Sequence, residues 1–192
     1  GGGAMERMPA RPAVGRRPFA AALWGAGAGT SARRAGARRG PARGPAAGGA
    51  KQPYTHMWVD AGGETHLTEL EMGGFRTQSY SAAPQAVKAD LGGTVRTAAF
   101  TELPPGWDNP WHCCPAPQLV VTLSGEWFVE TSDGARRTFT AGDVLYQDNV
   151  QDNAPGAGGS GQHYSGNAGA EPCRQLIVQL DRTPRVGPPT PL

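Results

Sequence analysis

Short runs of apolar and polar residues, separated by turn residues, occur along the chain from about residue 54. Three of them, at 54–59, 65–72 and 95–103, alternate with a period of two or are rich in β-branched and aromatic residues, as half-buried strands are. Further runs lie at 118–124, 126–131, 136–140, 142–148 and 173–180. About eight short strands at roughly 8 to 12 residue spacing, with no convincing helical period, predict an all-β sandwich or barrel.

Turn residues divide these runs. Asp133-Gly134 is the strongest hairpin signal, because both residues tolerate the positive φ of a two-residue turn. Residues 149–161 have turn composition throughout, which predicts a surface loop. The tail at 182–192 is rich in proline and is predicted to be extended or disordered, since proline lacks the N–H that a sheet needs.

The first 50 residues differ from the rest in composition. They contain nine Arg, no Lys and one acid, among many Ala, Gly and Pro. This predicts a disordered targeting segment, an organellar transit peptide for chloroplast or mitochondrion. The alternatives are a disordered basic tail of other purpose and an artefact of the gene model. Because the basic residues gather here, the net charge of +2 does not indicate nucleic-acid binding.

The remaining sequence predicts one folded domain at about 54–181, soluble inside the organelle. The chain has no apolar run near the ~18 residues that a membrane-spanning helix needs. Its three cysteines form no CxxC pair, and a reducing organellar interior favours free thiols.

The residues with most chemical potential lie between 105 and 125. If this segment is extended, His112, Cys114 and Gln118 share one face, because alternate side chains of a strand point the same way. A second histidine, His163, follows the Gly-rich stretch and could meet them. The alternative is that each histidine is a hydrogen-bonded interior residue that binds nothing.

These residues resemble motifs of the cupin superfamily, in particular of its small single-domain members. The first cupin motif, HxHxxxExxxxxxG, has the spacing of His112, Cys114, Gln118 and Gly125 in this chain, and matches it at His112 and Gly125. The turn at 141–143 and His163 resemble the two ends of the second motif. The resemblance covers about residues 54–181 and implies a cupin-type double-stranded β-helix, a jelly-roll barrel with little helix.

Cupin enzymes commonly hold a divalent metal on these motif positions. The resemblance therefore implies a metal site of His112, Cys114, Gln118 and His163, for Fe, Mn, Ni, Zn or Cu. Cys114 in place of the motif histidine makes the site softer, and Gln118 in place of the motif glutamate removes a negative ligand. Zn²⁺ or Cu therefore becomes more suitable than Fe²⁺ or Mn²⁺. Cys114 precedes a proline and can instead lie on a loop. His66 is a further candidate, since small cupins carry a similar DGE(S/T)H sequence.

Other residues are candidates for binding a small molecule. Three tryptophans near the motif could form aromatic walls, and two polar residues near a strand end could orient a substrate. The alternatives are core positions for the tryptophans and a solvated rim for the polar pair. These candidates are Trp107, Trp111, Trp127, Gln147 and Asp148. His56 has no evident partner and is predicted to be exposed or at the edge of the core.

Two classes of function follow. The first is a metal-dependent dioxygenase, lyase or isomerase acting on a small molecule; its catalytic residues are not predicted. The second is a non-catalytic function: a cupin that binds a small ligand, which the missing Glu favours, or an accessory subunit of an organellar complex. Leu119, Val121 and Leu123 point away from the predicted interior, so a homodimer through this sheet is expected to cover them.

Overall fold

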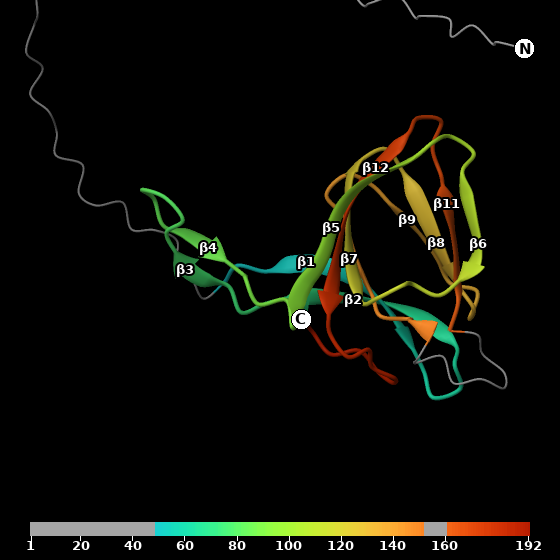
Figure 1. The fold of residues 1–192 in the computed structure, drawn as a ribbon, viewed down its shortest axis with the longest axis horizontal. Coiled ribbons are helices and arrows are strands. Elements are labelled where there is room, and N and C mark those ends of the chain that lie inside the picture. Colours follow the sequence, from blue (N-terminus) through green and yellow to red (C-terminus); the bar gives the residue numbers. More distant parts are fainter. Residues whose placement is uncertain (1–48, 152–160) are drawn as a thin grey trace, which may run out of the picture. The chain divides into compact units, whose positions relative to one another are not determined.

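Twelve β-strands make up nearly all of the regular structure in the part of the chain that the structure describes (Figure 1). The structure is a computed structural model and describes residues 49–151 and 161–192. The predicted targeting segment lies outside these residues except for its last two positions, and so does most of the predicted loop at 149–161. The strands are β1 (Gln52–Val59), β2 (Thr65–Met72), β3 (Arg76–Gln78), β4 (Gln85–Val87), β5 (Thr94–Leu103), β6 (Asp108–His112), β7 (Gln118–Ser124), β8 (Trp127–Thr131), β9 (Arg136–Phe139), β10 (Val144–Gln147), β11 (His163–Asn167) and β12 (Cys173–Asp181).

Two sheets form the barrel. One has six strands in the order β2-β1-β10-β7-β12-β5, and the other has four in the order β6-β11-β8-β9. Strands distant in sequence lie side by side: β1 pairs in parallel with β10, and β7 pairs with both β10 and β12. The described residues contain no α-helix, and none of them forms a helix that could span a membrane. The predicted all-β jelly roll is confirmed.

The alternation of side chains gives the six-stranded sheet two different faces. Met57, Val120 and Leu145, on three neighbouring strands, point inward and pack against the four-stranded sheet. Leu119 and Tyr146, one position away, pack into a second apolar cluster on the outer face. A strand's side chains alternate with period two, so one sequence position decides which cluster a residue joins.

Much of the outer face is covered by the chain itself. The predicted outward residue Leu119 is buried, and Leu91 and Leu192 pack against its cluster. Leu123, in contrast, remains 44% exposed. A partner is therefore not needed over the whole of this face.

The proline-rich tail lies against β1. The N–H of Gly187 donates to Val59 O at 2.8 Å, and the N–H of Leu192 donates to the Tyr54 hydroxyl at 3.0 Å. Val186 also forms an isolated parallel bridge with Val59. The tail thus belongs to no strand but makes specific contacts with the sheet.

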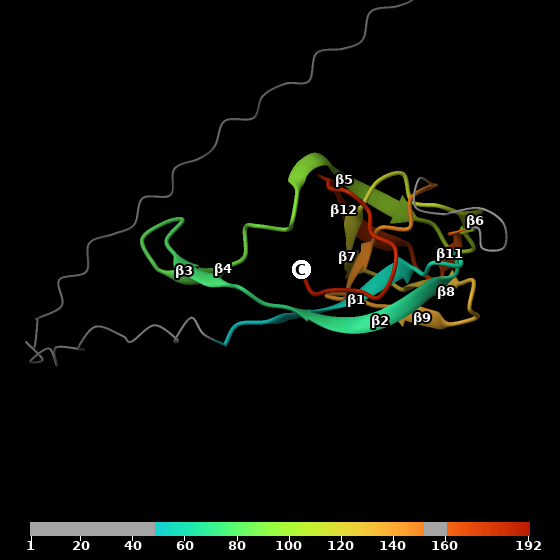
Figure 2. The ribbon, with the colours of Figure 1, turned by 90° about the horizontal axis from the view of Figure 1, so that it is seen from below.

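Residues 75–94 contain a short hairpin. Strands β3 and β4 pair only with each other. Figures 1 and 2 show this hairpin projecting beside the barrel. Its residues carry no strong alternation because a two-stranded ribbon exposed on both faces needs none.

Candidate functional site

A cavity of about 310 Å³ lies inside the barrel, between the two sheets. Six strands contribute inward-pointing polar side chains to it, and two tryptophans contribute apolar walls. Its described lining residues are Thr101, Leu103, Trp107, Asn109, His112, Cys114, Pro115, Gln118, Val120, Trp127, Gln147, His163, Ser165, Gln175, Ile177 and Gln179.

The structure brings most of the sequence-predicted site residues to this cavity. Those that line it are His112, Cys114, Gln118, His163, Trp107, Trp127 and Gln147. Three others, His66, Trp111 and Asp148, do not.

The two histidines come from adjacent strands. His112 ends β6 and lies opposite His163, which begins β11, and their ring centroids are 4.1 Å apart. His112 Nδ1 is 2.7 Å from Pro110 O and therefore donates to that carbonyl. Its Nε2 is then an acceptor for Asn109 Nδ2 at 3.0 Å. This tautomer follows from the hydrogen bonds that surround the ring.

His163 is buried among amide donors. Its Nδ1 lies 2.9 Å from Asn149 Nδ2, and its Nε2 lies 3.5 Å from Gln147 Nε2. Burial, and next the nearby His112, lower the pKa of His163 to about 3. The imidazole is therefore neutral at pH 7, since burial in low dielectric disfavours its charged form.

A row of carboxamides crosses the cavity wall. Gln179 Nε2 donates to Gln118 Oε1 at 3.2 Å, and Gln118 Nε2 donates to Gln147 Oε1 at 2.9 Å. The register of β12, β7 and β10 places these three residues directly opposite one another. Each amide thus donates to the next, in the direction of His163.

Cys114 is a neutral thiol in this cavity. It lies between β6 and β7, on the loop that Pro115 favours, and its thiol is 3.9 Å from Gln147 O. Burial, and next the charge of Asp148, raise the pKa of this thiol far above its ordinary value. Metals bind the thiolate, so this thiol would have to lose its proton to become a ligand.

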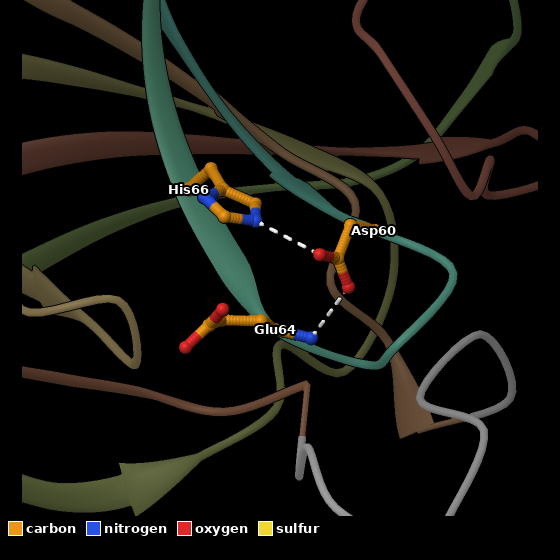
Figure 3. A group of neighbouring side chains, drawn as sticks. All are labelled: Asp60, Glu64 and His66. Carbon is orange, nitrogen blue, oxygen red and sulfur yellow. Dashed lines mark hydrogen bonds and ion pairs between the residues drawn. The ribbon is translucent and has the colours of Figure 1, made fainter.

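These residues form a poor donor set for a divalent metal ion, because none of them brings a negative charge to the site. The described cavity lining holds no carboxylate, Cys114 is a neutral thiol, and both ring nitrogens of His163 face amide nitrogens. Among the described residues, one group has three ligand atoms within 4.8 Å of one another: Asp60 and Glu64, on the turn after β1, and His66, on β2 (Figure 3).

The placement of His66 differs from the prediction that it could join His112 and His163. His66 lies opposite Trp58, on the outer face of the six-stranded sheet, and their ring centroids are 4.6 Å apart. Its Nδ1 is 2.8 Å from Asp133 and its Nε2 is 3.3 Å from Asp60. Burial opposes protonation, but these two carboxylates raise the pKa of His66. It therefore links the turn after β1 to the β8–β9 turn.

Figure 3 shows how this turn is built. Asp60 Oδ1 accepts the backbone N–H groups of Gly62 and Glu64, at 2.8 and 2.9 Å. Glu64 thus contributes its backbone to the turn. These bonds account for the cluster as a turn motif.

Three further predictions are corrected by burial and orientation. Trp111 is 45% exposed, with its ring facing Tyr164 on the outside of the four-stranded sheet. Asp148, a candidate for orienting a substrate or for a solvated rim, is 1% exposed, and its Oδ1 accepts a hydrogen bond from His56 Nε2 at 3.2 Å. His56 is correspondingly buried, with Asp148 as the partner that the sequence did not reveal. Both sit on the outer side of the sheet, beneath the tail.

Five polar lining residues were not predicted from the sequence: Thr101, Asn109, Ser165, Gln175 and Gln179. The alternation in 173–180 could have revealed two of them, because Gln175, Ile177 and Gln179 share the inward face. Gln175 Oε1 accepts from Thr101 Oγ1 at 3.2 Å, whereas its buried Nε2 has no hydrogen-bond partner among the described residues.

No protein-family model and no curated protein matches the chain. Solved structures similar to it include the protein YhaK from Escherichia coli, with 21% identity over 60% of this chain and 48% of YhaK and a TM-score of 0.40. The match to YhaK thus spans about half of that protein. An RmlC-like cupin family protein with a double-stranded β-helix fold from Methanocaldococcus jannaschii has 13% identity over 54% of this chain and 93% of its own, with a TM-score of 0.34.

A putative ethanolamine utilization protein Q from Salmonella typhimurium LT2 has 20% identity over 70% of this chain and 100% of its own, with a TM-score of 0.30. Likeness at this level carries no argument about activity. The fold is given by the strand order and pairing of the chain itself, two facing sheets of six and four strands around one interior. The described domain is a cupin-type double-stranded β-helix.

Proposed function

We propose that the barrel cavity binds a small, uncharged organic molecule. The observation that carries this proposal is the chemistry of the described lining: five carboxamides, two imidazoles, hydroxyls, a thiol and apolar walls, with no Asp, Glu, Lys or Arg. His163 and Cys114 are both held in their neutral forms. A charged ligand would lose its hydration here without gaining an opposite charge, which is costly.

The unpaired amide of Gln175 supports a ligand that accepts a hydrogen bond. A buried donor without a partner costs about 1 to 3 kcal/mol, so such a group is normally satisfied in use. A carbonyl or hydroxyl oxygen of the ligand would satisfy Gln175 Nε2. The apolar part of the same molecule would contact Trp107, Trp127 and Ile177, which line the same cavity.

The volume of about 310 Å³ suits a ligand of modest size, since sites for small molecules run from about 300 to 1,000 Å³. A compact amide, ketone or polyol would therefore suit the cavity. This corresponds to the non-catalytic ligand-binding function that the missing motif glutamate favoured.

The experiment compares compounds of one shape and different charge. Benzamide, benzoate and benzylammonium, with matched ketone and polyol sets, are tested at pH 7 by ligand-observed NMR. We expect the neutral members to bind more tightly than their charged counterparts. Tighter binding of a charged member, or no binding by any neutral compound, would contradict the proposal.

Two variants locate the binding. Gln175→Leu removes the unpaired donor at nearly constant size and should weaken neutral ligands by about tenfold, the effect of one lost hydrogen bond of roughly 1.4 kcal/mol. Gln78→Leu, on the exposed β3–β4 hairpin, is the matched control and should bind as the wild type does. Equal binding by both variants would show that the compounds bind outside the cavity.

The second candidate is a metal-dependent enzyme, and the pair of cavity imidazoles 4.1 Å apart favours it. The residues that would hold the ion are His112, His163 and Gln118. Gln118→Glu adds the missing carboxylate at the motif position, so it should raise affinity for Zn²⁺ or Mn²⁺ measured by calorimetry. Under the ligand-binding function, wild type binds either ion only weakly.

A further inference from the structure

Gln147 and His163 meet in the cavity wall through two nitrogen atoms. Their Nε2 atoms lie 3.5 Å apart, and both residues line the cavity. An amide nitrogen donates and does not accept, so this contact is a hydrogen bond only if Nε2 of the imidazole carries no proton. The hydrogen bonds around the ring decide where its proton lies.

Asn149 fixes the tautomer of His163. Its Nδ2 donates to Gly161 O at 2.8 Å and lies 2.9 Å from His163 Nδ1. Turning the Asn149 amide over would break the first bond and bring two oxygen atoms together, so its nitrogen faces the ring. His163 Nδ1 is therefore an acceptor, and the single proton of the neutral ring is on Nε2. His112 has the opposite tautomer, because its Nδ1 donates to Pro110 O.

The row of carboxamides fixes the orientation of Gln147 in the same way. Gln179 Nε2 donates to Gln118 Oε1, and Gln118 Nε2 donates to Gln147 Oε1. The oxygen of Gln147 is thus occupied, and its amide nitrogen ends the row beside His163. The two Nε2 atoms are therefore donors with no acceptor among the described residues. Both residues are only 3% exposed, so water does not readily satisfy these donors.

We propose that Gln147 and His163 form a carbonyl seat, in which a ligand carbonyl oxygen accepts a hydrogen bond from each Nε2. An oxygen atom about 2.9 Å from both nitrogens fits between donors that are 3.5 Å apart. A carbonyl oxygen has two lone pairs and no proton, whereas a hydroxyl would bring a further proton that needs its own acceptor. This inference rests on the proposed ligand-binding function and adds the group that the ligand carries.

The carbonyl seat and the unpaired donor of Gln175 lie at different levels of the cavity. Gln147 belongs to the row that ends at Gln179, and Gln175 lies four residues before Gln179 on β12. Four residues of a strand span about 13 Å, and Ile177 lines the cavity between them. Each donor site therefore takes its own oxygen. The ligand class is an uncharged molecule with a carbonyl group at one end, a second oxygen acceptor at the other and an apolar middle.

The first test reads the two tautomers without any ligand. Long-range proton–nitrogen NMR spectra of the full chain at pH 7 show which ring nitrogen is protonated. We expect the proton of His163 on Nε2 and that of His112 on Nδ1, so each ring is the control for the other. A His163 proton on Nδ1 would overturn the carbonyl seat, because Nε2 would then accept from Gln147. That result would leave the neutral-ligand function standing.

The second test counts the carbonyl groups that the cavity recognises. Para-diacetylbenzene is compared by ligand-observed NMR with analogues in which one or both C=O groups are replaced by C=CH2. This replacement keeps the shape and removes the acceptor. Each replacement should weaken binding to the wild type about tenfold, the effect of one lost hydrogen bond. In Gln175→Leu the first replacement should change little and the second should still cost about tenfold, because one carbonyl remains in the seat.

Gln147→Glu closes the seat. Its carboxylate keeps the bond from Gln118 and also accepts the Nε2 proton of His163. In Gln147→Glu/Gln175→Leu all three compounds should therefore bind within about twofold of one another. Gln85→Glu, on the exposed face of β4, is the matched control and should keep the wild-type pattern. Circular dichroism checks that every variant folds.

The outcomes separate the carbonyl seat from the function on which it rests. Loss of the whole carbonyl preference in Gln175→Leu alone would overturn the seat and leave a neutral-ligand cavity. A carbonyl preference that survives in Gln147→Glu/Gln175→Leu would overturn the seat as well, since another group would then hold the oxygen. Failure of all three uncharged compounds to bind the wild type would overturn the proposed function and the seat together.

Discussion

The neutral state of His163 has a consequence for stability. Its pKa is about 3 in the folded protein and about 6.5 in an unfolded chain. Between these values the unfolded chain binds a proton that the folded protein does not bind. The free energy of unfolding therefore falls as the pH falls below about 6.5, and it does not depend on this group at higher pH.

The variant His163→Gln isolates this effect. Between pH 6 and 4.5, urea unfolding of the wild type should lose about 1.4 kcal/mol per pH unit more than the variant does. Groups such as Asp60 and Asp133 are present in both proteins and cancel in the difference. Parallel pH profiles for the two proteins would show that His163 is not held neutral in the fold.

Position 125, the glycine of the first motif, requires glycine because of its backbone conformation and its close neighbours. Its φ is +74°, and an added Cβ would lie 2.7 Å from both Cys173 Cα and Pro172 O. Gly134 has a similar φ of +83° but open space around it. Gly134→Ala should lower the free energy of unfolding by about 1 to 2 kcal/mol, because alanine is disfavoured in the left-handed backbone conformation. Gly125→Ala should lower it clearly more, because the neighbouring backbone must also move. Equal losses of unfolding free energy in the two variants, measured by chemical denaturation, would contradict this.

At the scale of the element, the period of two explains which predictions succeeded. The motif around Gln118 predicted an inward face, and Gln118 and Val120 do line the cavity. The same rule places His66 outside, because it follows Thr65, which is buried, by one position. From sequence alone the pairing of β2 with β1 was unknown, so its inward face could not be chosen.

The composition of the tail did not reveal its contacts with the sheet. Proline predicts the absence of a strand, and none forms, but single N–H groups between the prolines still bond to β1 and to Asp148. Such contacts depend on where the outer face leaves an acceptor or an apolar gap. They follow from the packed sheet, which local sequence does not describe.

Deleting residues 183–192 tests the role of the tail. The deletion removes the bond from Gly187 to Val59 and the apolar contact of Leu192, and it exposes part of the cluster around Tyr54. We expect the free energy of unfolding to fall by about 2 to 3 kcal/mol. Replacing the β3–β4 hairpin by a short Gly-Ser linker is the control and should change it little. An unchanged melting temperature after the tail deletion would contradict the contacts described.

For the whole molecule, spacing and turn signals predicted an all-β sandwich or barrel, and the resemblance to the cupin motifs selected the jelly-roll barrel. The motif positions His112, Cys114, Gln118 and His163 all line its cavity. They were not enough to predict the state of those residues. The neutral thiol of Cys114 and the neutral ring of His163 result from burial by distant strands. The row of amides likewise requires the register of β7, β10 and β12, which brings Gln118, Gln147 and Gln179 together.

The central claim is that this interior is a neutral ligand cavity with no resident metal. The most direct test is the metal content of the chain, expressed without a histidine tag and reconstituted with Fe, Mn, Ni, Zn or Cu. Wild type and His112→Ala/His163→Ala are compared by mass spectrometry of the elements, with circular dichroism to check folding. The account predicts equal content, well below one equivalent, in both proteins. Near-stoichiometric metal in the wild type that is lost from the folded double variant would contradict it.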